Sequence, residues 1–124
     1  MNADLDSIRR LIPLLDMAFQ KEQMKMAKIA ARIYDLREQL MGLERPESFG
    51  PLSVGTRMGA DVLWETWVQD RKALITQEMA LALQDRENQR GDLIAALSKV
   101  EAAKQVEKRA RMQAKQLEIR RASW

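Results

Sequence analysis

The 124-residue chain contains no cysteine and no histidine. Without cysteine, neither a disulfide nor a thiolate metal site can form, and without histidine the commonest metal ligand and neutral-pH general base is missing. Nearby carboxylates such as Asp85 and Glu87 lie in hydrophilic stretches that do not predict a pocket. We therefore expect a protein that is not an enzyme, with no catalytic residue, no metal site and no cofactor.

Aromatic residues and long apolar runs are also scarce. Aromatic residues make up 5% of a sequence that is 46% hydrophobic, which argues against a compact globular core. The longest apolar runs, such as residues 11–15, are far shorter than the roughly 20 residues needed to span a bilayer, and no signal segment opens the chain. We expect no membrane insertion and a cytoplasmic location.

Helix-breaking residues are confined to one part of the chain. Most of the glycines and prolines lie between positions 42 and 59, where backbone entropy and missing N–H donors oppose a helix. The composition predicts a connector over residues 44–59, between a first helix over about 4–43 and a second over about 60–121. We expect residues 1–124 to form a single domain.

Seven-residue hydrophobic repeats flank this connector on both sides. The first repeat has the alternating 3/4 spacing of a coiled-coil seam, and its positions are Ile8, Ile12, Leu15, Phe19, Glu22, Met26, Ile29, Ile33, Leu36, Leu40 and Leu43. The second recurs at every seventh residue: Val68, Ile75, Ala82, Gln89, Ala96, Ala103, Ala110 and Leu117. Each repeat has one polar interruption, Glu22 or Gln89. Because a narrow apolar stripe needs a partner helix to leave water, the repeats predict an all-α fold, a two-helix antiparallel coiled-coil hairpin with a longer, overhanging C-terminal helix.

The lengths of the two helices predict which residues overhang. Placing Leu43 opposite Ala60 puts Ile8 near Ala95, so the first helix would end near Val100 of the second. Residues beyond Val100, about 35 Å of helix at 1.5 Å per residue, would then lack a partner within the hairpin.

Positive charge is concentrated in the same segment. Residues 99–124 hold eight basic and three acidic side chains. We interpret this segment as an insertion element for an acidic partner; the alternatives are a solvated tail or a tail that pairs with a second copy in a homodimer. The lack of aromatic residues between the basic positions argues against direct nucleic-acid binding. The candidate partner-binding residues are Lys104, Lys108, Arg109, Arg111 and Lys115.

Two tryptophans, Trp64 and Trp67, follow the connector directly. They either cap the end of the coiled coil or offer an indole ring to a partner protein, because tryptophan is enriched at binding hot spots. Trp67 is next to the seam residue Val68, so we expect Trp67 to be the cap and Trp64 the partner-binding anchor.

Two long stretches of the chain share features with a known family. They are LIPLLDMAFQKEQMKMAKIAARIYDLREQL (residues 11–40) and WETWVQDRKALITQEMALALQDRENQRGDLIAALSKVEAAKQVEKRARMQ (residues 64–113). The features are a Leu-rich leading heptad with an early glutamate (Glu22), an aromatic-flanked hairpin end (Trp64 and Trp67), a middle rich in Gln and Arg, and a closing helix rich in Lys, Glu and Arg. In these features the chain resembles flagellar FliJ and related type III secretion stalk proteins.

The resemblance implies a coiled-coil hairpin similar to the central stalk of rotary ATPases. Such a protein would be a non-enzymatic stalk or assembly component of a flagellar or type III protein export ATPase. Its helical termini would lie in the pore of the hexameric export ATPase, and it would also touch the export-gate protein. The alternative, from the residues alone, is a self-associating structural coiled coil or helical adaptor protein.

Overall fold

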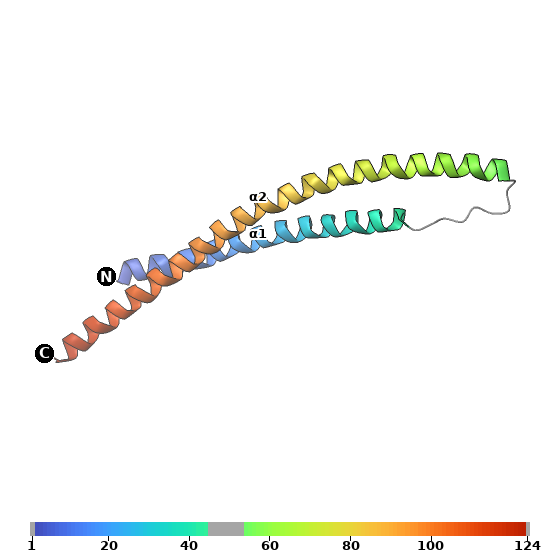
Figure 1. The fold of residues 1–124 in the computed structure, drawn as a ribbon. Helices are drawn as coiled ribbons and strands as arrows, with labels where there is room; N and C mark the ends of the chain where they lie inside the picture. Colours follow the sequence, from blue (N-terminus) through green and yellow to red (C-terminus); the bar gives the residue numbers. More distant parts are fainter. Residues whose placement is uncertain (1, 45–53, 124) are drawn as a thin grey trace. The chain divides into compact units, whose positions relative to one another are not determined.

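The computed structural model describes residues 2–44 and 54–123 (Figure 1). They form two helices, α1 (Asn2–Leu43, 42 residues) and α2 (Val54–Ser123, 70 residues), and no strand. The helices pack against each other in antiparallel directions. The predicted all-α hairpin with a longer C-terminal helix is therefore confirmed. Residues 45–53 of the predicted connector lie outside the described part of the chain.

The second helix begins earlier than predicted, at Val54 rather than near position 60. It passes through Gly55 and Gly59, which the composition assigned to the connector. A glycine inside a helix costs about 1 kcal/mol relative to alanine, a penalty that a long packed helix tolerates. Because the prediction counted both glycines as part of the connector, it placed the start of α2 too late in the sequence.

The first helix continues through Pro13 back to Asn2. Proline has no backbone N–H, so the carbonyl of Arg9 loses its helical hydrogen bond at this point. The preceding turns remain attached to the fold because Leu5 is buried. At the other end of α1, the Glu44 N–H donates to the Met41 carbonyl at 3.2 Å and closes the last turn.

Packing divides the chain into two compact units, each built from part of α1 and part of α2. One unit consists of residues 28–87, and the other consists of residues 1–27 and 88–124. In the first unit, the buried residues Ile33 and Leu36 of α1 form a cluster with Ile75 and Ala82 of α2. The partly buried residues packed on this cluster are Ile29, Leu40, Leu43, Met79 and Leu83. Large aliphatic side chains therefore hold residues 28–87 together.

Smaller side chains line the seam of the second unit. Its buried apolar residues are Leu5, Val100 and Ala103, and the half-buried Ala96 and Ala110 continue the row of alanines along α2. Every seam position predicted for α1 is buried or half-buried. The same holds for every seam position predicted for α2 except Leu117, which is 36% exposed. The predicted seams are thus confirmed.

The two polar interruptions of the seams meet each other. Gln89 is buried, and its Nε2 donates to the Glu22 backbone carbonyl at 3.1 Å and to the Glu22 Oε2. The Nζ of Lys25 lies 3.4 Å from the Glu22 Oε1. The hydrogen bond from Gln89 is the main cause that lowers the pKa of Glu22 below its ordinary value of 4.5; Lys25 adds to the effect, and partial burial opposes it. Each seam therefore supplies the polar partner that the other requires.

This contact corrects the predicted register. The predicted alignment places Glu22 opposite Leu81, but Glu22 meets Gln89, about one heptad further along α2. Ile8 likewise lies beside Val106 and Ala110 rather than Ala95. The physical reason is that a buried polar group left without a partner costs about 1–3 kcal/mol, so the two polar residues must share a layer.

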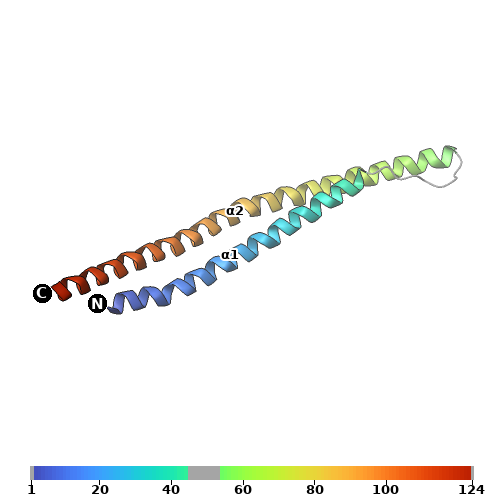
Figure 2. The same ribbon diagram turned by 90° about the horizontal axis from the view of Figure 1, so that it is seen from below.

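The prediction that the overhang begins at Val100 is consequently wrong. Val100 and Ala103 are buried, Glu107 pairs with Arg9 of α1, and Ala110 lies beside Ile8. Within residues 28–87, it is the start of α2 that continues past the end of α1 (Figure 2). The C-terminal end of α2 also continues past the start of α1 (Figure 1), and its residues 115–123 are all exposed, so the C-terminal overhang exists but is shorter than predicted.

The buried cluster predicts a strong effect of a charge at Leu36. Leu36→Asp places a carboxylate among the buried apolar side chains of Ile33, Ile75 and Ala82, so we expect a loss of several kcal/mol of stability. Thermal unfolding followed by circular dichroism measures this loss. Tyr34→Asp, at a site 63% exposed, is the control and should melt within a few degrees of the unmodified protein. Equal melting curves for Leu36→Asp and the control would contradict the seam.

The lowered pKa of Glu22 predicts a pH dependence with a defined sign. Ionised Glu22 stabilises the fold at pH values above its ordinary pKa of 4.5, and this contribution is lost as the pH falls through the lower pKa of the folded state. We expect the urea midpoint of the unmodified protein to fall, relative to that of Glu22→Gln, as the pH decreases from about 6 to about 3. Parallel pH profiles for the two proteins would show that Glu22 has the same pKa folded and unfolded.

Candidate partner-binding surfaces

The described residues offer no centre for metal chemistry and no membrane span. Nowhere in residues 2–44 and 54–123 do three or more acidic side chains gather in a way that could hold a metal ion. Neither described helix contains a stretch long and apolar enough to cross a bilayer.

Four of the predicted partner-binding residues form one row, here called the basic stripe. Lys104, Lys108, Arg111 and Lys115 follow one another at spacings of four, three and four, which places them on the same face of a helix. All four side chains are exposed. Each of these residues directly follows a buried or half-buried residue, so the stripe runs along α2 on one flank of the face that packs on α1.

Arg109 is exposed but does not belong to this stripe. It follows Lys108 directly and therefore points about 100° away from it around the helix. Arg109 instead borders a shallow groove with Asp4 and Ser7 of α1. The structure thus separates one predicted site residue from the other four.

An ionic contact extends the basic stripe onto α1. The Oε1 of Glu107 lies 3.7 Å from the Nε of Arg9 and 3.9 Å from the Nη1 of Arg111. One carboxylate thus serves two guanidinium groups, so the cluster keeps a net positive charge. Sequence reasoning missed Arg9 because its position beside α2 follows only from the correct register.

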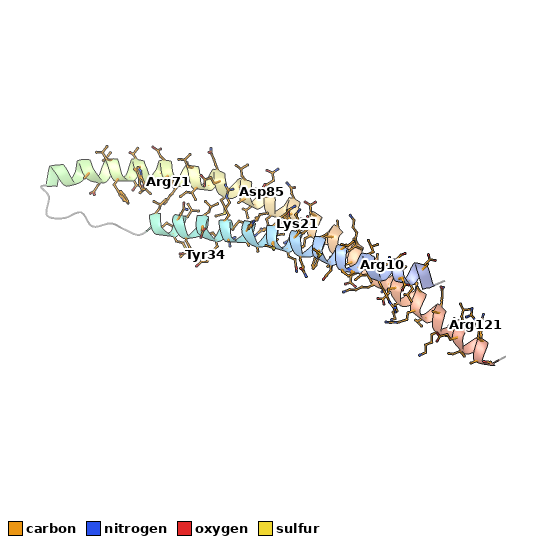
Figure 3. All side chains as sticks on the ribbon, turned by 180° about the vertical axis from the view of Figure 1, so that it is seen from behind. Arg10, Lys21, Tyr34, Arg71, Asp85 and Arg121 are labelled. Atoms are coloured by element: carbon orange, nitrogen blue, oxygen red, sulfur yellow. The ribbon has the colours of Figure 1, made fainter. Side chains whose placement is uncertain are left out.

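An open groove lies where α1 begins and α2 approaches its end. Its floor is lined by Leu5, Ala110, Ala114 and Leu117, and Arg121 lies at its border. Alanine side chains are too short to fill the space between the helices, which is why the groove exists. Figure 3 shows Arg121 near the end of α2.

The two tryptophans stack on each other near the start of α2. Their ring centroids are 5.1 Å apart, with 23° between the ring planes. Trp67 is 51% exposed and Trp64 is half-buried, so the more exposed ring is not the one predicted. Trp64 precedes the seam residue Val68 by four positions and shares its face, whereas the adjacent Trp67 points about 100° away.

Comparison with known proteins adds no relative. The chain matches no protein-family model, no curated protein and no solved structure at a significant level. The similarity to the FliJ family therefore stays a prediction from the sequence features, and function is argued from the surfaces themselves.

A further row of apolar residues, here called the outer stripe, lies on α2. Trp67, Leu74 and Leu81 are one heptad apart and are 51%, 52% and 59% exposed. Each directly precedes a buried seam residue, so the two rows have the same seven-residue period. Sequence reasoning missed the outer stripe because it attributed that period to the seam alone.

The stacked pair predicts different roles for its two rings. Trp64→Ala should lower stability by about 1–2 kcal/mol, less than the 3–5 kcal/mol typical of a fully buried tryptophan, because Trp64 is half-buried. Trp67→Ala should cost less, because more of the ring is already in water. Thermal melting of both variants measures the difference. The control is Tyr34→Ala, since Tyr34 points away from α2 (Figure 3). A larger loss for Trp67→Ala would contradict these roles.

Proposed function

We propose that this protein is a non-enzymatic stalk or assembly component of a flagellar or type III protein export ATPase. The end formed by residues 2–27 and 88–123 enters the hexameric ring, and the region of Trp64 and Trp67 contacts the export-gate protein. The protein acts in the cytoplasm, beside the membrane-embedded export apparatus. The chain supplies no catalytic residue and contributes through its shape and charge.

The observation that carries this proposal is the basic stripe. Four exposed cations, with Arg9 beside them, lie on a helix whose apolar side is already covered by α1. A row of cations attracts an acidic surface over long range and fixes its orientation without burying apolar area. An acidic lining in the opening of a ring is the complementary partner surface.

The register changes how this end would enter a ring. A single unpaired helix would have to cover its apolar seam with the ring, whereas here α1 covers that seam as far as Ala103 and lies beside Ala110. We therefore propose that a paired two-helix end enters the ring. Truncation after Val100 would remove Ala103 and the Arg9 contact of Glu107, so it would disturb the fold together with any binding surface.

A second candidate function, a self-associating coiled coil or helical adaptor, is favoured by the outer stripe. Its three large apolar residues face water in a single copy of the chain. An exposed row with heptad spacing is the kind of surface on which another helix packs.

Charge reversal tests the ATPase proposal. We expect the triple variant Lys104→Glu/Lys108→Glu/Lys115→Glu to bind a purified hexameric export ATPase at least about tenfold more weakly at about 0.1 M salt, and the difference to shrink at higher salt as exposed charges are screened. Calorimetry or fluorescence anisotropy measures the Kd.

The matched control is Lys28→Glu/Arg32→Glu/Arg37→Glu, in the unit of residues 28–87. It changes the net charge by the same amount at exposed positions outside the basic stripe. If both triple variants weakened binding to the ATPase equally, the binding would result from general charge attraction and not from the basic stripe. The proposal would be overturned if the unmodified chain did not bind the ring.

A further inference from the structure

We propose that two copies of this protein associate through the outer stripe, with their α2 helices antiparallel and centred on Leu74. The inference specifies the self-association candidate and does not depend on binding to an ATPase. It uses only residues 67–81, which lie within the unit of residues 28–87. The basic stripe lies in the other unit, so the two surfaces share no residue.

The outer stripe has the spacing of a second coiled-coil seam. Trp67, Leu74 and Leu81 repeat every seven residues, about 10.5 Å apart along the helix axis, and about half or more of each side chain is exposed. Single exposed apolar residues are normal on a protein surface. A regular row of three large ones matches the layers that a neighbouring helix contributes to a coiled coil.

Charges beside the stripe select a second copy as the partner. Arg71 and Glu78 lie on one flank of the stripe, seven residues apart, and both are exposed. Neither forms an ion pair with any other described residue. They cannot pair with each other, because two helical turns separate them.

An antiparallel pair centred on Leu74 satisfies all of these groups together. Leu74 faces Leu74 of the second copy, and Trp67 faces its Leu81. Corresponding flanks meet in an antiparallel helix pair, so Arg71 of each copy lies beside Glu78 of the other. The pairing therefore contains two equivalent opposite-charge contacts as well as the apolar layers.

The opposite flank introduces no repulsion in the same arrangement. It carries Asp70 and Gln77, and the antiparallel alignment places each Asp70 beside Gln77 of the other copy. A parallel, in-register pair would leave Arg71 and Glu78 about 10.5 Å apart along the axis. A parallel pair would place Arg71 beside Asp70 of the other copy and leave Glu78 beside Gln77. We commit to the antiparallel orientation because it gives Glu78 a cation, and the disulfide test below distinguishes the two orientations.

Three large apolar layers make a short interface, so we expect a reversible dimer. Sedimentation velocity of the full chain over a concentration series should show a monomer–dimer equilibrium. Leu74→Gln, at the centre of the interface, should weaken dimerisation at least about tenfold. The matched control is Leu14→Gln, because Leu14 of α1 is also an exposed leucine, at 62%, and should leave the equilibrium unchanged.

A charge exchange tests the flank contacts separately. Arg71→Glu places a second carboxylate beside Glu78 of the other copy and should weaken the dimer, whereas the double variant Arg71→Glu/Glu78→Arg restores opposite charges and should recover it. Circular dichroism melting of each variant confirms that the hairpin itself is intact. Failure of the double variant to recover dimerisation, with melting unchanged, would overturn the proposed flank contacts.

Disulfide trapping reads out the orientation, because the chain contains no cysteine of its own. Leu74→Cys lies at the two-fold axis and should oxidise to a linked dimer, since the two Cβ atoms meet there. Leu81→Cys faces Trp67 of the other copy and should remain unlinked. Equal linking of both variants would overturn the antiparallel orientation.

A monomer throughout the sedimentation concentration series would overturn the pairing itself. That result would not affect the ATPase proposal, which the charge-reversal experiment tests separately.

Discussion

The alignment of α1 with α2 depends on one buried polar contact, in which Gln89 donates to Glu22. Repeats of seven residues allow two helices to slide by one heptad and still place apolar side chains against each other. Such a slide would separate Gln89 from Glu22 and leave buried polar atoms unpaired, which is costly. The contact therefore determines which part of α1 covers Val100 and Ala103, and hence that Arg9 lies beside Glu107.

Sequence patterns predicted the architecture of the hairpin but not its alignment. The spacing of residues such as Ile33 and Ile75 reports which face of each helix is apolar, and that information is local. The register is not local, because all layers of a regular repeat look alike. The two exceptions, Glu22 and Gln89, carried the missing information, and matching them to each other would have placed them in one layer. The early start of α2 escaped prediction because Gly55 and Gly59 were treated as helix breakers, whereas each glycine within a helix costs only about 1 kcal/mol.

The candidate surfaces were predictable to the extent that they follow from helix geometry. The spacing of Lys104, Lys108, Arg111 and Lys115 already places them on one face, whereas the contact of Arg9 with Glu107 requires the three-dimensional alignment. Adjacency along the chain misled the assignment of the tryptophans, because neighbours in sequence point in different directions on a helix and residues four apart share a face. The outer stripe was present in the sequence as a second heptad row.

The row of alanines in the seam of residues 88–124 has a consequence for local opening. Alanine removes less apolar surface from water than isoleucine does, so we expect the α2 side of the seam in this unit to expose less apolar surface when the helices separate than the α2 side around Ile75. The most positively charged segment of the protein thus gives up little buried apolar surface of its own when a partner reshapes it.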